Sequence, residues 1–177
     1  DDLDTPRNRK GAVESIQQDL LSLGLIWDGP VVFQSARLDL YNSILSAFKA
    51  ENKLYACSCS RSFLASQNVS NKLNFVYPGN CRDLSLPWIM KNGKSHSLRL
   101  RVSSDFAFTC GDILLKRADG FIAYNLATVV DELTLGISEV VRGEDLIAVE
   151  SSQLAITEAL DSSSVSYRYV PLLCDVH

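Results

Sequence analysis

No apolar run in this 177-residue sequence reaches the roughly 18 residues that a membrane-spanning helix needs. The chain also lacks the basic opening of a secretory signal peptide, because it begins with the acidic segment Asp1-Asp2-Leu3-Asp4. These absences predict a cytoplasmic protein with no membrane partner. In that reducing compartment structural disulfides are rare, and clustered cysteines more often hold a metal ion. The odd number of cysteines, five, also disfavours a complete disulfide framework.

The rest of the composition is that of an ordinary soluble globular protein, with 46% hydrophobic and 21% charged residues. The length suits one domain, or one domain with a small insertion. We therefore expect a single hydrophobic core and look for function in local patterns of residues.

Charge is distributed unevenly along the chain. Residues 61–101 contain seven Lys and Arg against the single acid Asp83, whereas residues 129–177 contain nine Asp and Glu against Arg142 and Arg168. This asymmetry predicts two distinct surfaces, of which the basic one could face the phosphates of a nucleic acid. The alternative is a solvated surface that happens to be rich in lysine.

Apolar spacing predicts an alternation of helices and short strands. The expected helices are residues 9–23, 35–51, 60–67, 122–133 and 151–160. The expected strands are residues 31–33, 54–57, 97–102, 106–108, 113–117, 137–141 and 167–173. This order predicts an α/β fold with a cysteine-bearing insertion somewhere within residues 52–118.

Three cysteines fall in two short stretches, Y-A-C-S-C-S-R and Y-P-G-N-C-R. In an extended chain Cys57 and Cys59 point to the same face, and the Pro-Gly-Asn turn can fold Cys81 and Tyr77 toward one point. A zinc ion requires four tetrahedral ligands. The three thiolates supply three, and the fourth could be Tyr77, His96 or water. The alternative is that the cysteines fill small gaps in a core, as we expect for the isolated Cys110 and Cys174.

Several stretches together resemble the catalytic core of the glutamyl-tRNA synthetases, and most of all their truncated branch, the glutamyl-Q tRNA(Asp) synthetases. They are D-D-L-D-T-P-R, G-L-I-W-D-G, Q-S-A-R, the two cysteine motifs, R-A-D-G-F-I-A-Y-N-L-A-T-V-V-D-E and V-V-R-G-E-D-L. The resemblance covers almost the whole chain in matching order. It implies a Rossmann-like class I core with a small zinc-binding insertion. Residues 1–53 and 119–177 would form the core, and residues 54–118 the insertion.

The resemblance also implies a zinc site. Carried over position by position, its ligands are Cys57, Cys59, Tyr77 and Cys81, with the tyrosine as the fourth ligand.

The same resemblance implies a glutamate site made of Asp1, Tyr124 and Arg142. Physically, a bound glutamate needs an anion for its ammonium group and a fixed cation for its side-chain carboxylate. Arginine suits the second task because its planar fork pairs with a carboxylate through two parallel hydrogen bonds. Without the resemblance, Tyr124 reads as an interfacial aromatic, and Arg142 as an ion-pair partner of Glu144 or Asp145.

Two signatures of class I synthetases are absent from the sequence: a H-I-G-H-like turn and a K-M-S-K-S-like loop. In the family the first precedes D-D-L-D and the second follows P-L-L-C-D. We therefore expect a fragment that lacks the first strand and the C-terminal signature loop, carries no catalytic residue of those motifs and is inactive alone.

The function that the resemblance implies is activation of glutamate with ATP and Mg²⁺, followed by transfer of the glutamyl group to queuosine in tRNA(Asp) by a monomeric protein. One alternative within the same chemistry is a discriminating glutamyl-tRNA synthetase that charges tRNA(Glu). Another, of a different class, is a non-catalytic zinc-stabilised module that binds RNA through residues 61–101.

Overall fold

The computed structural model of the chain describes residues 2–67, 76–163 and 165–174. The chain divides into two compact units, residues 1–40 and 41–177, which are described separately. Within these residues, every helix is too short or too polar to pass through a lipid bilayer.

The first unit holds one regular helix, α1 (Ala12–Ser22), between the short 3-10 turns η1 (Thr5–Arg7) and η2 (Gln34–Arg37). Gly24 ends the helix as its sequence predicts, with a left-handed φ of 74°. The amide of Leu25 then donates to the carbonyl of Leu20 at 2.9 Å, which completes a Schellman-type cap. Near the chain start, the Ser35 amide donates to the carboxylate of Asp2 at 2.9 Å.

Two predicted strands are wrong. Residues 31–33 form no strand and lead instead into η2, where the Ala36 amide donates to the Phe33 carbonyl. Residues 106–108 belong to a helical turn, α4 (Ser104–Ala107), in which the Cys110 amide reaches back to the Phe106 carbonyl. Runs of two or three apolar residues are too short for periodicity to separate a strand from a helical turn.

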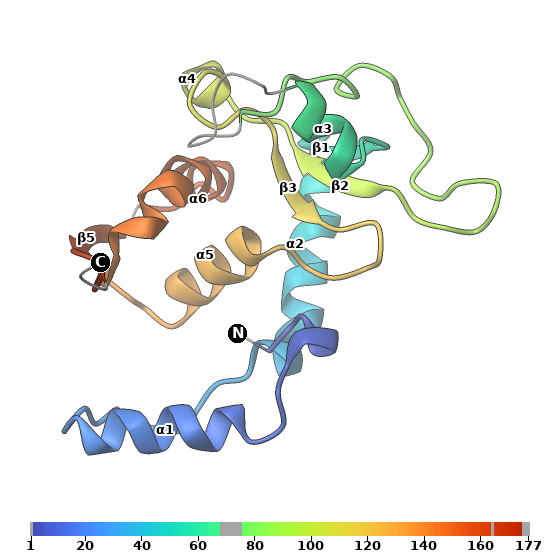
Figure 1. The fold of residues 1–177 in the computed structure, drawn as a ribbon. Helices are drawn as coiled ribbons and strands as arrows, with labels where there is room; N and C mark the ends of the chain where they lie inside the picture. Colours follow the sequence, from blue (N-terminus) through green and yellow to red (C-terminus); the bar gives the residue numbers. More distant parts are fainter. Residues whose placement is uncertain (1, 68–75, 164, 175–177) are drawn as a thin grey trace. The chain divides into compact units, whose positions relative to one another are not determined.

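The second unit contains a three-stranded antiparallel sheet with β2 (Ser97–Leu100) between β1 (Leu54–Cys57) and β3 (Ile113–Lys116). The short helix α3 (Arg61–Gln67) follows β1 (Figure 1), and its Leu64 packs in a buried cluster with Tyr55 and Cys57 of that strand. The hydroxyl of Ser60 accepts the Phe63 amide at 3.1 Å, which confirms the predicted helix start. Gly111, before β3, forms a bridge with Tyr77.

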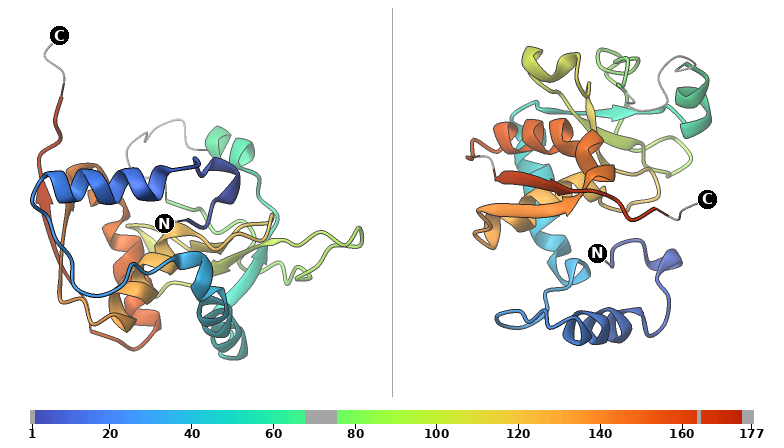
Figure 2. Two further views of the ribbon diagram at one scale, coloured as in Figure 1. Left: turned by 90° about the horizontal axis from the view of Figure 1, so that it is seen from below. Right: turned by 60° about the vertical axis from the view of Figure 1, so that its left-hand side comes forward.

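A parallel pair of strands, β4 (Glu139–Gly143) and β5 (Ser166–Val170), forms the other sheet. Parallel neighbours need a crossover, supplied here by η3 (Glu144–Leu146) and α6 (Ile147–Ala159). The views in Figure 2 show the two strands side by side with α6 next to them. This is a β-α-β unit, and α5 (Tyr124–Thr134) packs against its helix.

Helix α2 (Leu38–Ala50) and helix α5 carry much of the core. The spacing of Leu38, Tyr41, Leu45 and Phe48 predicts one buried face of α2, and the last three are buried whereas Leu38 is 42% exposed. Tyr41 is fully enclosed, and its hydroxyl donates to Asp131 of α5 at 2.8 Å. The fully buried side chains Leu126 of α5 and Ile156 of α6 extend this core toward β4 and β5.

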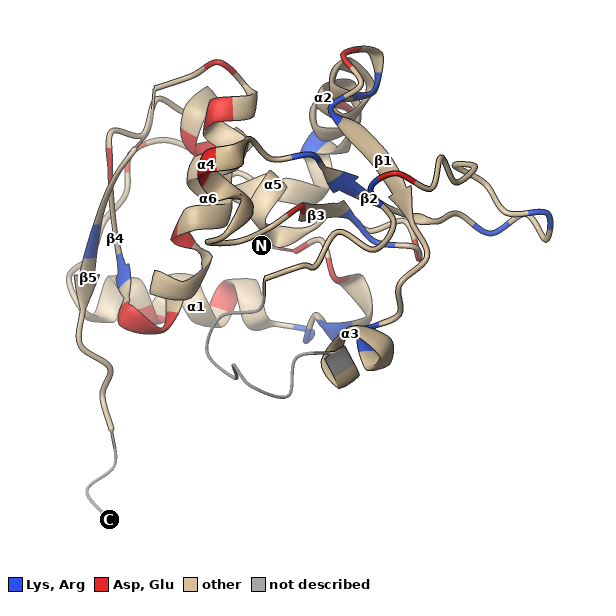
Figure 3. Cartoon of the chain, turned by 90° about the horizontal axis from the view of Figure 1, so that it is seen from above, with Lys and Arg blue, Asp and Glu red and all other residues tan. Residues whose placement is uncertain are grey.

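The two halves of the second unit differ in charge (Figure 3). Lys and Arg gather on the β1–β2–β3 sheet, α3 and the adjoining loops, whereas α5, α6 and η3 carry mainly Asp and Glu. The asymmetry along the sequence is therefore also an asymmetry in space.

Candidate functional site

Cys57, Cys59 and Cys81 converge as their spacing predicts. Their three sulfur atoms all lie within 4.8 Å of one another, and Cys59 Sγ is 3.5 Å from Cys81 Sγ. Cys57 and Cys81 are buried, and Cys59 is partly exposed. All three thiols are free, so the cluster is not a disulfide framework.

Tyr77 occupies the fourth corner of this cluster. Its hydroxyl oxygen lies 3.3 Å from Cys57 Sγ and 3.5 Å from Cys59 Sγ. It also accepts the Cys81 amide at 3.0 Å, which fixes the turn between the two residues. Gly111 passes so close behind that a Cβ atom there would lie 2.5 Å from the Tyr77 carbonyl oxygen.

These separations fit a tetrahedral zinc site. Ligands at about 2.3 Å (sulfur) and about 2.0 Å (oxygen) from one zinc ion lie roughly 3.5–3.8 Å from each other. The Tyr77–Cys59 and Cys59–Cys81 pairs, each at 3.5 Å, meet that spacing, and the Tyr77–Cys57 pair is slightly shorter at 3.3 Å. The other candidate, His96, is held elsewhere, with Nδ1 2.7 Å from the Pro87 carbonyl oxygen.

The protonation of the cluster is uneven. Burial raises the pKa of Cys81, but hydrogen bonds from Ser58, Tyr77 and Cys59 outweigh it and bring that pKa down to about 7. Burial raises the pKa of Cys59 to about 11 and raises that of Tyr77 as well. Arg99 places its guanidinium 3.7 Å from the centre of the Tyr77 ring, where the cation and the ring attract each other. Among these three groups, Cys81 is thus the one that ionises most readily.

A buried carboxylate joins the cysteine cluster to the sheet. Asp112 accepts the Tyr55 hydroxyl at 2.7 Å and the Val102 amide at 3.0 Å, and it forms an ion pair with Arg82. Since Arg82 directly follows Cys81, this network anchors the loop that carries two of the candidate ligands.

Arg142, on β4, is fixed by neutral groups. Its Nη1 donates to Gln153 Oε1 of α6 at 2.6 Å, and its Nη2 donates to the Tyr169 hydroxyl of β5 at 3.0 Å. The guanidinium also lies 4.2 Å from the centre of the Tyr167 ring. Among residues 2–67, 76–163 and 165–174 it forms no ion pair, so the alternative of a salt bridge to Glu144 or Asp145 is not met.

Two carboxylates are connected to the surroundings of Arg142 by hydrogen bonds from the tyrosines that contact its guanidinium. The Tyr167 hydroxyl donates to Glu132 at 2.9 Å, and the Tyr169 hydroxyl donates to Glu150. Burial raises the pKa of Glu132, while the Tyr167 hydroxyl and the charge of Arg142 act in the opposite direction. The Nε atom of Arg142 is buried and has no hydrogen-bond partner, so the guanidinium keeps unused donors.

Tyr124, the second predicted glutamate contact, is not hydrogen-bonded to this network within the described residues. Tyr124 begins α5 with 42% of its surface exposed, and within the described part of the chain its hydroxyl makes no hydrogen bond. The groups that hold Arg142 come from β5 and α6 instead. Asp1 lies outside the described residues.

The sequence reasoning missed Gln153, Tyr167 and Tyr169. The two tyrosines alternate along β5, so they face the same side of the strand, and this period-two pattern was a usable signal. Gln153 is completely buried, which is unusual for an amide side chain, but burial is not visible in the sequence.

Residues 1–177 match the family model described as tRNA synthetases class I (E and Q), catalytic domain. The chain is 63% identical over 175 residues to a glutamyl-Q tRNA(Asp) synthetase of Prochlorococcus marinus (strain MIT 9303). It is 49% identical over the same length to a protein of the same name from Synechococcus sp. (strain CC9605). Each alignment covers 99% of this chain and 57% of the relative, so the chain spans little more than half the length of these relatives.

The fold has solved counterparts. The structure of a glutamate-tRNA synthetase from Elizabethkingia anophelis superposes with a TM-score of 0.78 at 20% sequence identity, covering 98% of this chain and 42% of that one. The predicted class I catalytic-core fold is thereby confirmed.

Proposed function

Because the chain belongs to the class I tRNA synthetase family for glutamate and glutamine, as part of its catalytic domain, we propose that the protein activates glutamate with ATP and passes it to a tRNA. The names of its relatives favour the finer statement that the acceptor is queuosine in tRNA(Asp). The division into residues 1–53, 54–118 and 119–177 is kept as part of this proposal.

The observation that carries the proposal is the state of Arg142. The half-buried guanidinium is held by an amide, a hydroxyl and an aromatic ring, and it forms no ion pair with any residue that the structure describes. Leaving a buried N–H without a partner costs about 1–3 kcal/mol, and a ligand carboxylate would remove that cost for Nε. We assign Arg142 to the side-chain carboxylate of glutamate, with Tyr124 and Asp1 as further contacts.

The reaction takes two steps. In the first, an α-carboxylate oxygen of glutamate attacks the α-phosphorus of ATP, and the bond to the departing pyrophosphate breaks, which leaves glutamyl-adenylate. In the second, a nucleic-acid hydroxyl attacks the activated carbonyl, loses its proton and releases AMP. Arg142 acts by orientation in both steps, since it forms no covalent bond to the substrate.

The cysteine cluster has a structural part in this proposal. Cys57, Cys59, Tyr77 and Cys81 would hold one Zn²⁺, which, when bound, crosslinks the end of β1 to the Tyr77–Cys81 turn. The residues around it contribute without the ion: Asp112 and Arg82 anchor the turn, and Gly111 lets Tyr77 approach the sheet.

The test uses the intact protein that contains this chain. Glutamate-dependent exchange of pyrophosphate into ATP should occur, and radiolabelled glutamate should then become attached to tRNA(Asp) that carries queuosine. Attachment to tRNA(Glu) instead would favour the discriminating synthetase. Absence of exchange by a folded, zinc-loaded protein would refute glutamate activation and favour the non-catalytic RNA-binding module.

A further inference from the structure

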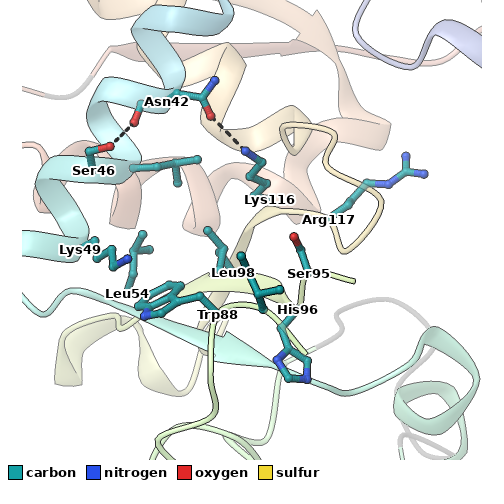
Figure 4. A pocket seen from close by; sticks show the side chains of 12 residues that line it. Asn42, Ser46, Lys49, Leu54, Trp88, Ser95, His96, Leu98, Lys116 and Arg117 are labelled. Carbon is teal, nitrogen blue, oxygen red and sulfur yellow. Dashed lines mark hydrogen bonds between the residues drawn. The ribbon is translucent and has the colours of Figure 1, made fainter. Parts of the chain in front are cut away.

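A cavity of about 260 Å³ lies on the basic half of the second unit, apart from the cysteine cluster and Arg142 (Figure 4). Helix α2, strands β1, β2 and β3, and the turn between Trp88 and His96 surround it. It is smaller than the roughly 300–1,000 Å³ of most small-molecule pockets. The space therefore suits one flat group better than a whole cofactor.

The lining combines an aromatic ring, an apolar floor and positive charge. Trp88 is half-buried, and the floor is made by Leu45, Leu54 and Leu98. Three cations reach the cavity, Lys49, Lys116 and Arg117, and no carboxylate lines it in the described part of the chain. A wall with this charge attracts an anion and repels a cation.

The backbone that carries the Trp88 ring is fixed by hydrogen bonds to the facing segment of the chain. The His96 amide donates to the Trp88 carbonyl at 3.1 Å, and Ile89 pairs with Ser95 in a short bridge. The buried His96 ring is fixed to the Pro87 carbonyl oxygen. Trp88 is thus a preformed platform at the base of a small hairpin.

The cations are placed around that platform. Lys49 Nζ lies 4.5 Å from the centre of the Trp88 ring, and Lys116 Nζ donates to Asn42 Oδ1 at 3.0 Å (Figure 4). Arg117, which forms an ion pair with Asp119, also lines a second cavity of about 440 Å³, where the charged residues are Arg61, Arg99, Arg117 and Asp119, so cations outnumber the one carboxylate. Positive charge therefore continues from the first cavity to the next along the same face.

We propose that this cavity binds one unpaired nucleotide of an RNA, with the base against Trp88 and the flanking phosphates near Lys49, Lys116 and Arg117. A stacking aromatic beside a cationic track is the common means of holding single-stranded RNA. The inference rests on the proposed function only in taking the RNA to be a tRNA.

Tryptophan fluorescence tests the stacking directly. The chain has two tryptophans, so the Trp27→Phe variant reports on Trp88 alone. Titration with a tRNA(Asp) transcript should quench that signal, whereas the Trp88→Phe variant, which keeps Trp27, should show little quenching. The reverse pattern would overturn the proposal.

Charge is tested with matched lysines. Lys49→Gln and Lys116→Gln should each weaken transcript binding several-fold. Each should also reduce the slope of log Kd against log salt concentration by about the amount expected for one phosphate contact. Lys91→Gln and Lys94→Gln, on the exposed tip of the same hairpin, serve as controls. Equal losses in all four variants would mean a diffuse electrostatic surface and overturn the pocket. Saturation of the Trp88 signal by AMP at the transcript's concentrations would overturn the RNA assignment.

Failure of the proposed function remains distinguishable. Pyrophosphate exchange is measured on the wild-type protein without RNA. If pyrophosphate exchange is absent but Trp88 is quenched normally, the proposed function fails and the RNA pocket stands. If exchange occurs but Trp88 is not quenched, only the RNA pocket is refuted.

Discussion

The cysteine cluster draws its polar groups from one short stretch of chain, Cys57 to Cys81, whereas the groups around Arg142 come from two strands and the helix between them. In the first region the side chains approach each other at the separations of a metal site. In the second, neutral partners position a guanidinium that forms no ion pair within the described residues. The first arrangement suits a metal ion that would be held by several ligands at once, and the second suits an anion that would pair with one fixed cation.

The largest expected effect comes from removing that cation. Arg142→Ala should lower kcat/KM for glutamate by about 100-fold or more, because two charge-assisted hydrogen bonds to the substrate carboxylate are lost. Pyrophosphate exchange at varied glutamate measures the loss, and zinc content should stay unchanged.

Arg168→Ala is the matched control for that variant. Arg168 lies on β5 between the two tyrosines and forms an exposed pair with Glu139 at 2.7 Å. Exposed pairs contribute little, so this variant should keep its activity within about twofold. Equal losses in the two variants would mean that Arg142 acts only through the fold.

Breaking the cysteine cluster should have the next largest effect, on stability first. Cys81→Ser should reduce bound zinc to well below one ion per chain and lower Tm by several degrees, because binding of a structural metal adds to folding free energy. Cys174→Ser, which changes an exposed thiol, should alter neither zinc content nor Tm. One zinc per chain in the Cys81 variant would place the metal elsewhere.

The two regions also differ in how far the sequence predicts them. Cys57 ends β1 and Cys59 follows two residues later, where an extended chain points both side chains to the same side, and Tyr77 approaches Cys81 through a short turn. Their meeting is a local property, so spacing predicts it. Arg142 meets Tyr169 only because β4 and β5 pair in a register that places them opposite each other. No pattern within either strand specifies that register.

The helices and strands also differ in whether local sequence rules predict them. The helix end at Gly24 and the start of α3 after Ser60 follow from local rules and are correct. The strand expected at residues 106–108 is wrong, since α4 and its C-cap Phe108 occupy this segment. A two-residue or three-residue apolar run has no period from which a strand could be told from a helical turn. The class I assignment depended on several motifs in matching order, and no single element would have supported it.

A smaller effect is expected from changing the residues that hold the guanidinium of Arg142 in place than from removing Arg142 itself. Gln153→Met keeps the volume of this buried side chain but removes the acceptor for Arg142 Nη1. We expect KM for glutamate to rise about tenfold while kcat changes less, because the charge remains but is less well oriented. Tyr169→Phe, which removes only the second acceptor, should raise KM about threefold. A fall in kcat at unchanged KM would contradict a positioning role.

The smallest effect concerns the cysteine cluster without metal, where the pKa shifts predict a stability maximum near pH 9. Cys81 has a folded pKa of about 7 against an ordinary value of 9.0, so between these values the unfolded chain binds the extra proton and stability rises with pH. Cys59 has a folded pKa of about 11, so above pH 9 the folded chain retains its proton and stability falls.

Thermal unfolding of the chelator-treated protein between pH 7 and 10.5 measures this curve, and a Cys59→Ser/Cys81→Ser variant should flatten it. Since the two thiols share a hydrogen bond, their titrations are coupled and the change in Tm should be small. Zinc should abolish the fall above pH 9, because a metal-bound thiolate has no proton to retain. If stability still falls above pH 9 in the zinc-loaded protein, Cys59 is not a zinc ligand, and the cysteine cluster does not bind zinc through all four predicted residues.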